Sequence, residues 1–115
     1  MTPIMYGIPN CDTVKKARVW LEQNGVDHVF HDYKKAGAEA DKLGLWIDEH
    51  GWETVLNRAG TTFKKLSEAD RTGIDKDKAV ALMLAQPSMI KRPVLDLGDR
   101  RLVGFKPDLY TAAFK

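Results

Sequence analysis

The chain has 115 residues, of which 43% are hydrophobic, and its 18 basic and 16 acidic side chains leave a formal charge of +2. This length predicts one domain, and so balanced a charge gives no support for a nucleic-acid or membrane surface. With one cysteine, no long apolar run and no secretory signal pattern, a secreted disulfide scaffold is disfavoured and a soluble, cytoplasmic monomer is expected.

The N-terminal third predicts a strand, a helix and a second strand. Ile4–Gly7 is an apolar run too short for a helix. Cys11–Asn24 has apolar residues at helical spacing and is followed by Gly25, a usual helix stop, while Asn10 is expected to cap its start. His28–Tyr33 then alternates as a strand does.

The rest of the chain predicts a helical block, a hairpin and a last helix. In chain order we expect a turn at Lys34–Gly37, a helix over Ala38–His50, a further helical turn over Trp52–Leu56, a loop over Asn57–Leu66, a short helix over Ser67–Arg71, a helix over Asp75–Gln86 ended by Pro87, strands at Val94–Leu97 and Arg101–Phe105, and a terminal helix over Pro107–Phe114.

This order of elements favours an α/β fold. A parallel βαβ unit followed by an antiparallel hairpin gives a mixed four-stranded sheet flanked by helices. Such a layout is that of a thioredoxin-like fold, formed by the whole chain as a single domain. The helical block, about residues 38–88, is then an insertion between the second and third strands.

Cys11 is placed where a strand turns into a helix, so unpaired N–H groups and the positive end of the helix dipole face its sulfur. This setting favours the thiolate, which is the nucleophilic form. The alternative is a small buried hydrophobic residue, as many lone cysteines are. A single cysteine cannot close an intramolecular disulfide, so any redox cycle takes its second thiol from another molecule.

Several stretches, in the right order over nearly the whole chain, resemble the ArsC/Spx family and most closely its YffB-like subgroup. They are Tyr6–Thr13 with Lys15-Lys16-Ala17, Phe30–Tyr33, Gly51-Trp52, Leu56–Thr62, Ile90–Pro93 and Gly104-Phe105. The resemblance implies a thioredoxin-like fold with a helical insertion and a nucleophilic cysteine at the first strand–helix turn.

The resemblance further implies an oxidoreductase, a glutathione-dependent thiol reductase whose Cys11 forms a mixed adduct that glutathione or a glutaredoxin resolves. An arsenate reductase coupled to glutathione and glutaredoxin is the alternative. By position, Arg58 and Arg92 match two of the three arginines that hold the oxyanion, and the third falls on Lys106. A lysine lacks the planar fork of arginine, and Gly7 stands where arsenate reductases have a histidine; both departures weaken the arsenate alternative.

The Spx branch of the family implies a further alternative, a regulator that binds a partner without catalysis. Those proteins sense oxidation through a Cys-x-x-Cys pair, and Val14 stands where the second cysteine would be. We therefore do not expect RNA polymerase as a partner, and the balanced charge gives no reason to expect nucleic acid or a membrane.

The remaining candidates concern ligand binding. Pro93 is expected to be a cis proline beside Cys11, the alternative being a trans proline that starts an edge strand. Asn10 either caps the helix or contacts ligand, and the cap is favoured.

Thr61 and Thr62 either offer hydroxyls to the site or shape the loop, and Lys106 either faces the site or is solvent-exposed. For Arg58 and Arg92 the alternative to an anion site is a surface ion pair. Glutathione is the only co-substrate expected, and the three histidines and one cysteine predict no metal site.

Overall fold

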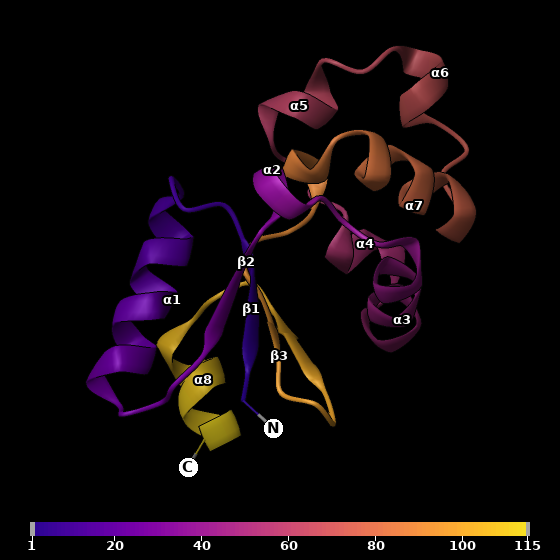
Figure 1. Ribbon diagram of the computed structural model, residues 1–115. Coiled ribbons are helices and arrows are strands. Elements are labelled where there is room, and N and C mark those ends of the chain that lie inside the picture. The colour runs from indigo at the N-terminus through magenta and orange to yellow at the C-terminus, as the bar shows by residue number, and fades with distance from the viewer. Residues whose placement is uncertain (1, 115) are drawn as a thin grey trace. The chain divides into compact units, whose positions relative to one another are not determined.

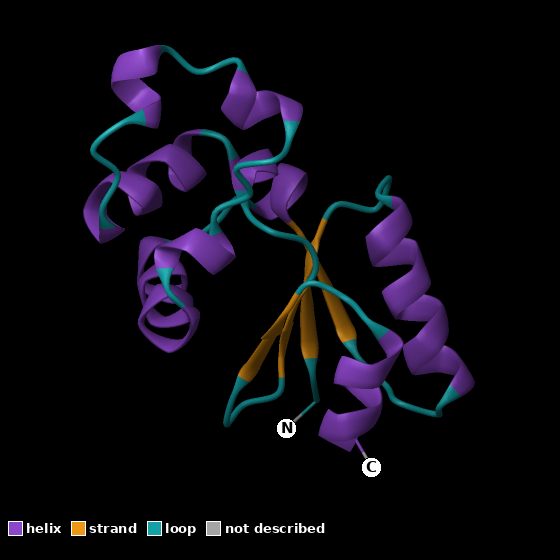
Figure 2. Cartoon of the chain, turned by 180° about the vertical axis from the view of Figure 1, so that it is seen from behind, coloured by secondary structure: helices purple, strands orange, loops and turns teal. Residues whose placement is uncertain are grey.

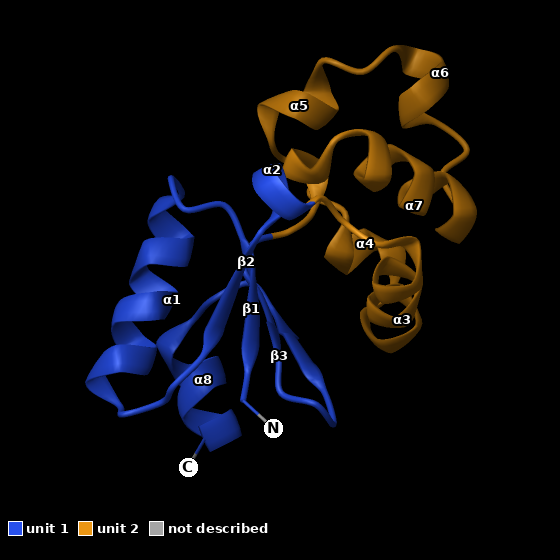
Figure 3. Cartoon of the chain, in the orientation of Figure 1, with its two compact units in different colours: residues 1–36, 92–115 blue, residues 37–91 orange. Residues whose placement is uncertain are grey.

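A computed structural model describes residues 2–114 (Figure 1) and divides the chain into two compact units (Figure 3). Unit 1 takes the residues up to Ala36 and those from Arg92 onward, and unit 2 takes Gly37–Lys91. No helix in the described part of the chain combines the length and the apolar character that crossing a membrane requires.

Unit 1 contains a four-stranded sheet in the order β2-β1-β3-β4. Its strands are β1 (Ile4–Gly7), β2 (Val29–Asp32), β3 (Val94–Asp96) and β4 (Arg101–Val103). The pair β1–β2 is parallel, whereas β1–β3 and β3–β4 are antiparallel. The helix α1 (Asp12–Gln23) makes the crossover between the parallel strands, so the predicted mixed sheet is confirmed.

One face of this sheet holds the core of unit 1. Met5, Leu95 and Leu102 are register partners across β1, β3 and β4, and their side chains point to the same face. They pack against Val14, Ala17 and Leu21 of α1 and against Tyr110 of α8 (Pro107–Phe114). Figure 2 shows α1 and α8 on the same side of the sheet.

Unit 2 is helical. Its elements are α3 (Ala40–His50), α4 (Trp52–Val55), α5 (Thr61–Lys64), α6 (Glu68–Arg71), α7 (Lys76–Ala85) and the 3-10 helix η1 (Pro87–Met89). The helices α3 and α7 pack together, and Leu43 and Trp46 of α3 and Met83 of α7 are almost completely buried. Asp75 caps α7 and Ser67 caps α6, each accepting a hydrogen bond from an amide three residues on, which confirms both predicted starts.

Two segments predicted to lack helix contain a helical turn. The predicted turn after β2 is α2 (Tyr33–Ala36), which begins where the Asp32 carboxylate accepts a hydrogen bond from the Lys34 amide at 2.9 Å. The predicted loop over residues 57–66 includes α5, whose Phe63 is 8% exposed. A single buried aromatic residue anchors this turn, and one apolar residue leaves no helical period in the sequence.

Candidate active site

Cys11 occupies the N-cap position of α1, with an extended backbone. Its carbonyl accepts the first helical hydrogen bond, from the Lys15 amide at 2.9 Å. The side chain is half-buried and packs against the core of unit 1. The prediction that Asn10 caps this helix is therefore wrong, because Asn10 is an exposed residue of the preceding turn, one position before the cap.

The close approach of α1 to the sheet depends on Gly7 at the end of β1. A Cβ atom built on Gly7 would lie 2.9 Å from Cγ2 of Val14, a fully buried residue in the first turn of α1. Real Cβ atoms are not found so close to another carbon. Glycine at this position thus lets the first turn of α1, and Cys11 with it, lie against the end of β1.

The surroundings of Cys11 stabilise its thiolate. Partial burial acts to raise the pKa of the Cys11 thiol, but the amides of Val14 and Thr13 and the Arg92 guanidinium together outweigh it, so the pKa lies below its ordinary value. No side-chain hydrogen bond of regular geometry closes the cap. We therefore ascribe the helix contribution to the direction of the N–H dipoles of the first turn.

Sheet register accounts for Arg92 being next to Cys11. Tyr6 of β1 pairs with Val94 of β3 in antiparallel fashion. The residues that precede β3 consequently lie at the same end of the sheet as the residues that follow β1. Pro93 precedes β3 directly, its peptide bond with Arg92 is cis as expected, and its carbonyl accepts a hydrogen bond from the Gly104 amide at 2.8 Å.

Three rings that sequence reasoning did not single out gather near this end of the sheet. Tyr6 and His31 are register partners whose ring centroids are 4.8 Å apart, and the Tyr33 ring lies 6.2 Å from that of Tyr6. Tyr33 is 1% exposed, and its hydroxyl has no hydrogen-bond partner among the described residues. Burial raises the pKa of Tyr33, as does nearby Tyr6, while Arg92 opposes the rise. The signal that could have found Tyr33 is its place directly after β2, beside β1.

Lys106 also belongs to unit 1. It directly precedes α8, its side chain is exposed, and its carbonyl accepts a hydrogen bond from the Tyr110 amide at 3.2 Å. Its part in a site stays a prediction.

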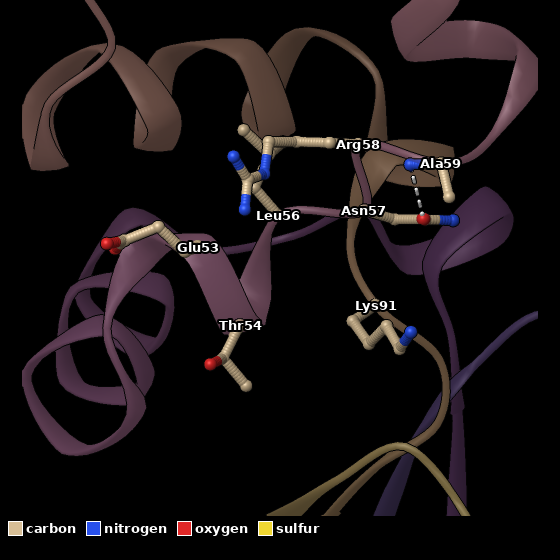
Figure 4. A pocket seen from close by; sticks show the side chains of 7 residues that line it. All are labelled: Glu53, Thr54, Leu56, Asn57, Arg58, Ala59 and Lys91. Atoms are coloured by element: carbon tan, nitrogen blue, oxygen red, sulfur yellow. Dashed lines mark hydrogen bonds between the residues drawn. The ribbon is translucent and has the colours of Figure 1, made fainter.

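Arg58, Thr61 and Thr62 belong to unit 2. The Arg58 guanidinium lies 5.3 Å from the centroid of the Trp52 ring. Arg58 lines an open pocket of about 380 Å³, which Lys91 also lines (Figure 4). The Asn57 side chain accepts a hydrogen bond from the Ala59 amide at 3.2 Å and so shapes the turn that carries Arg58.

The two threonines line a second pocket in unit 2, of about 270 Å³. The hydroxyl of Thr62 is 3.2 Å from that of Ser88, within hydrogen-bond distance. The structure thus places Asn10, Cys11, Arg92, Pro93 and Lys106 in unit 1 and brings Arg92 close to Cys11. The grouping of Arg58, Thr61 and Thr62 with Cys11 stays a prediction.

Comparison with known proteins gives matches over nearly the full length. Residues 6–113 match the model of the ArsC family. A solved structure described as a YFFB protein is 61% identical, with a TM-score of 0.97 over 99% of this chain and 100% of the other.

Two further relatives extend the comparison. The solution structure of an arsenate reductase (ArsC) related protein from Brucella melitensis is 56% identical, with a TM-score of 0.78 over 100% of this chain and 96% of the other. An uncharacterised protein of Haemophilus influenzae is 37% identical over 96% of each chain.

Proposed function

Because the chain belongs to the ArsC family, we propose that it is a glutathione-dependent thiol reductase in which Cys11 is the nucleophile. The supporting observation is the environment of the one thiol in the chain. Cys11 stands at the start of α1 beside Arg92, and its pKa is lowered although burial opposes this. A lowered pKa increases the thiolate fraction at neutral pH.

The proposed reaction is thiol–disulfide exchange on a substrate joined to glutathione. The Cys11 thiolate attacks the glutathione sulfur, the old disulfide breaks, and the substrate leaves as a thiolate that takes a proton from water. Cys11 is then joined to glutathione. A second glutathione, as its thiolate or through a glutaredoxin, attacks that sulfur, which yields glutathione disulfide and restores Cys11.

Other residues receive binding roles in this proposal. The Arg92 guanidinium holds the thiolate before attack, and we assign to Arg58 a second positive charge for a carboxylate of glutathione. The backbone next to Pro93 pairs with the glutathione backbone. Asn10, Thr61, Thr62 and Lys106 supply further polar contacts.

Reduction of arsenate by the same thiol is the second candidate. The Brucella melitensis relative, described as related to an arsenate reductase, favours it. Gly7 counts against it, because the histidine that arsenate reductases have there would begin with a Cβ atom 2.9 Å from Val14. Turnover of arsenate with glutathione and glutaredoxin, lost in Cys11→Ser, would establish this candidate.

The deciding experiment measures the thiol itself. We expect iodoacetamide to alkylate Cys11 with a midpoint below the ordinary thiol pKa of about 8.5. Incubation with glutathione disulfide should add one glutathione per chain by intact mass, and Cys11→Ser should take none. A thiol that titrates as a free cysteine and forms no adduct faster than a model peptide would overturn the proposal.

A further inference from the structure

Unit 1 carries an open apolar groove of about 410 Å³ between α1 and the start of α8. Val19 and Trp20 line it from α1, Phe105 lines it from the segment that leads into α8, and Pro107 is the first residue of α8. Val19 is 48% exposed, although α1 packs on the core through its other face. Trp20 and Phe105 also pack against the core cluster that Cys11 contacts.

The charge of the groove has one sign. Lys15 and Lys16 are the charged residues that line it, and neither side chain forms an ion pair with any residue between positions 2 and 114. Lys15 lies one helical turn beyond Cys11, to which it is joined by the first hydrogen bond of α1. An apolar surface with cations at the end near a thiol is complementary to a segment that carries carboxylates and an aliphatic side chain.

We propose that this groove binds the chain segment next to the reacting cysteine of a protein substrate, one that is acidic and aliphatic and joined to glutathione through that cysteine. This proposal rests on the proposed thiol reductase function and names its substrate class. The substrate leaves as a protein thiol in the exchange described above.

The helix fixes the spacing that such a substrate needs. With a rise of 1.5 Å per residue, Lys15 lies about 6 Å and Val19 about 12 Å beyond Cys11 along the axis of α1. An extended peptide advances about 3.3 Å per residue. A carboxylate two residues from the substrate cysteine therefore reaches the lysines, and an aliphatic side chain four residues away reaches Val19.

A symmetric probe tests this without knowledge of the direction of binding. The probe is the glutathionylated peptide Leu-Ser-Glu-Ser-Cys-Ser-Glu-Ser-Leu, compared with the same peptide carrying Lys for Glu or Ser for Leu. We expect kcat/KM for the acidic leucine peptide to exceed that of each comparison peptide about tenfold. For the serine peptide this is the scale of burying one aliphatic side chain, and for the lysine peptide attraction to Lys15 and Lys16 becomes repulsion.

A matched pair of variants assigns the effect to the groove. Val19→Glu places a carboxylate among the apolar groove residues. Leu45→Glu likewise replaces an exposed aliphatic residue by glutamate, in a helix of unit 2 where Leu45 is 46% exposed. Val19→Glu should raise KM for the acidic leucine peptide about tenfold, whereas Leu45→Glu should not. The mixed disulfide of glutathione and mercaptoethanol is too short to reach Val19 and reports the thiol chemistry alone.

The outcomes separate the two proposals. If the small disulfide is reduced but the peptides are used equally, or Val19→Glu has no effect, the groove proposal fails and the thiol reductase function stands. If neither small nor large disulfide is reduced, the proposed function fails. Calorimetric binding of the three peptides, with Ser for Cys, to the Cys11→Ser variant then decides the groove: preference for the acidic leucine peptide supports it, and no preference overturns it.

Discussion

At the scale of single residues, the reactivity of Cys11 is a balance of opposing effects. Burial favours the neutral thiol, and the first-turn amides with Arg92 favour the thiolate. Because the latter prevail, the pKa lies below its ordinary value, and the thiolate fraction at a given pH exceeds that of a free cysteine.

Removing the positive charge of Arg92 should reduce the stabilisation of the Cys11 thiolate. In Arg92→Ala we expect the pKa of Cys11 to rise, because burial then acts against fewer favourable charges, and alkylation at pH 7 to slow. Arg92→Lys should restore part of the effect, since lysine keeps the charge. The measurement is the pH dependence of iodoacetamide alkylation.

Arg18→Ala is the matched control for Arg92→Ala. Arg18 belongs to the same α1 as the Cys11 cap, but its guanidinium lies over the Phe30 ring, 4.5 Å from the centroid, and it does not contribute to the pKa of Cys11. Equal alkylation midpoints for the two alanine variants would contradict a specific role for Arg92.

At the scale of secondary-structure elements, the close packing of α1 against β1 depends on Gly7, which has no side chain. Gly7 leaves room for Val14, so α1 starts close to the sheet with Cys11 at its cap. The position of the thiol therefore depends on packing between two elements as well as on the local sequence of the helix start.

Gly7→Ala should destabilise the fold by about 1–3 kcal/mol, the usual cost of overpacking a tight core. Val14→Ala removes the atom that a new Cβ would meet, so the cost of the double variant should be smaller than the sum of the single ones. Denaturant unfolding measures these free energies.

Gly44→Ala provides the control for this substitution. A Cβ on Gly44 would meet Cε of Lys76 at 3.8 Å, an ordinary contact, inside α3. Alanine there should stabilise the protein by about 0.5–1 kcal/mol, because glycine is unfavourable within a helix. A Gly7→Ala variant as stable as the wild type would show that β1 and α1 separate easily.

The elements that can be predicted from the sequence are those in which a pattern of apolar residues extends over many positions. Val14, Ala17 and Leu21 repeat at helical spacing, and Gly98 between two apolar runs indicates the hairpin. In α5 only Phe63 is buried, so no period exists to detect. Cap propensity favours asparagine and so predicts Asn10 as the N-cap, whereas in the structure Cys11, one residue later, is the N-cap.

The site is less accessible to prediction, because its residues meet through pairing of distant strands. Arg92 comes near Cys11 through the register of Tyr6 with Val94, which no local pattern encodes; the resemblance to a family supplied that proximity. The contact of Arg58 with the Trp52 ring is likewise a matter of side-chain packing and was not predicted.

At the scale of the whole molecule, unit 1 contains two buried phenols. Tyr33 and Tyr110 are almost fully buried, and burial raises the pKa of both above the ordinary value of about 10. A pKa raised by folding means that the stability contribution is fully present below pH 10 and is lost as the pH rises beyond it. Alkali should therefore unfold the protein through these groups.

Tyr110→Phe should make the molecule less sensitive to alkali. Each such group steepens the fall of the unfolding free energy by at most about 1.4 kcal/mol per pH unit, and phenylalanine removes one of them. The Tyr110 hydroxyl also has no hydrogen-bond partner among the described residues, so the variant should be at least as stable as the wild type at pH 8. Urea unfolding at pH 8, 10 and 11 measures both effects, and an unchanged slope with pH would refute the assignment.

The division of the chain also sets the order in which its parts can fold during synthesis. Unit 2 is one continuous segment, Gly37–Lys91, and all of its contacts are possible once that segment has left the ribosome. In unit 1, Met5 of β1 pairs with Leu95 of β3, so β1 cannot pair with β3 until about ninety further residues have been synthesised. Folding of unit 2 in the meantime shortens the effective loop between β2 and β3 and lowers the entropy cost of closing the sheet. The nascent β1 and β2, still lacking β3, are the stretch of the chain that a ribosome-bound chaperone would have to shield.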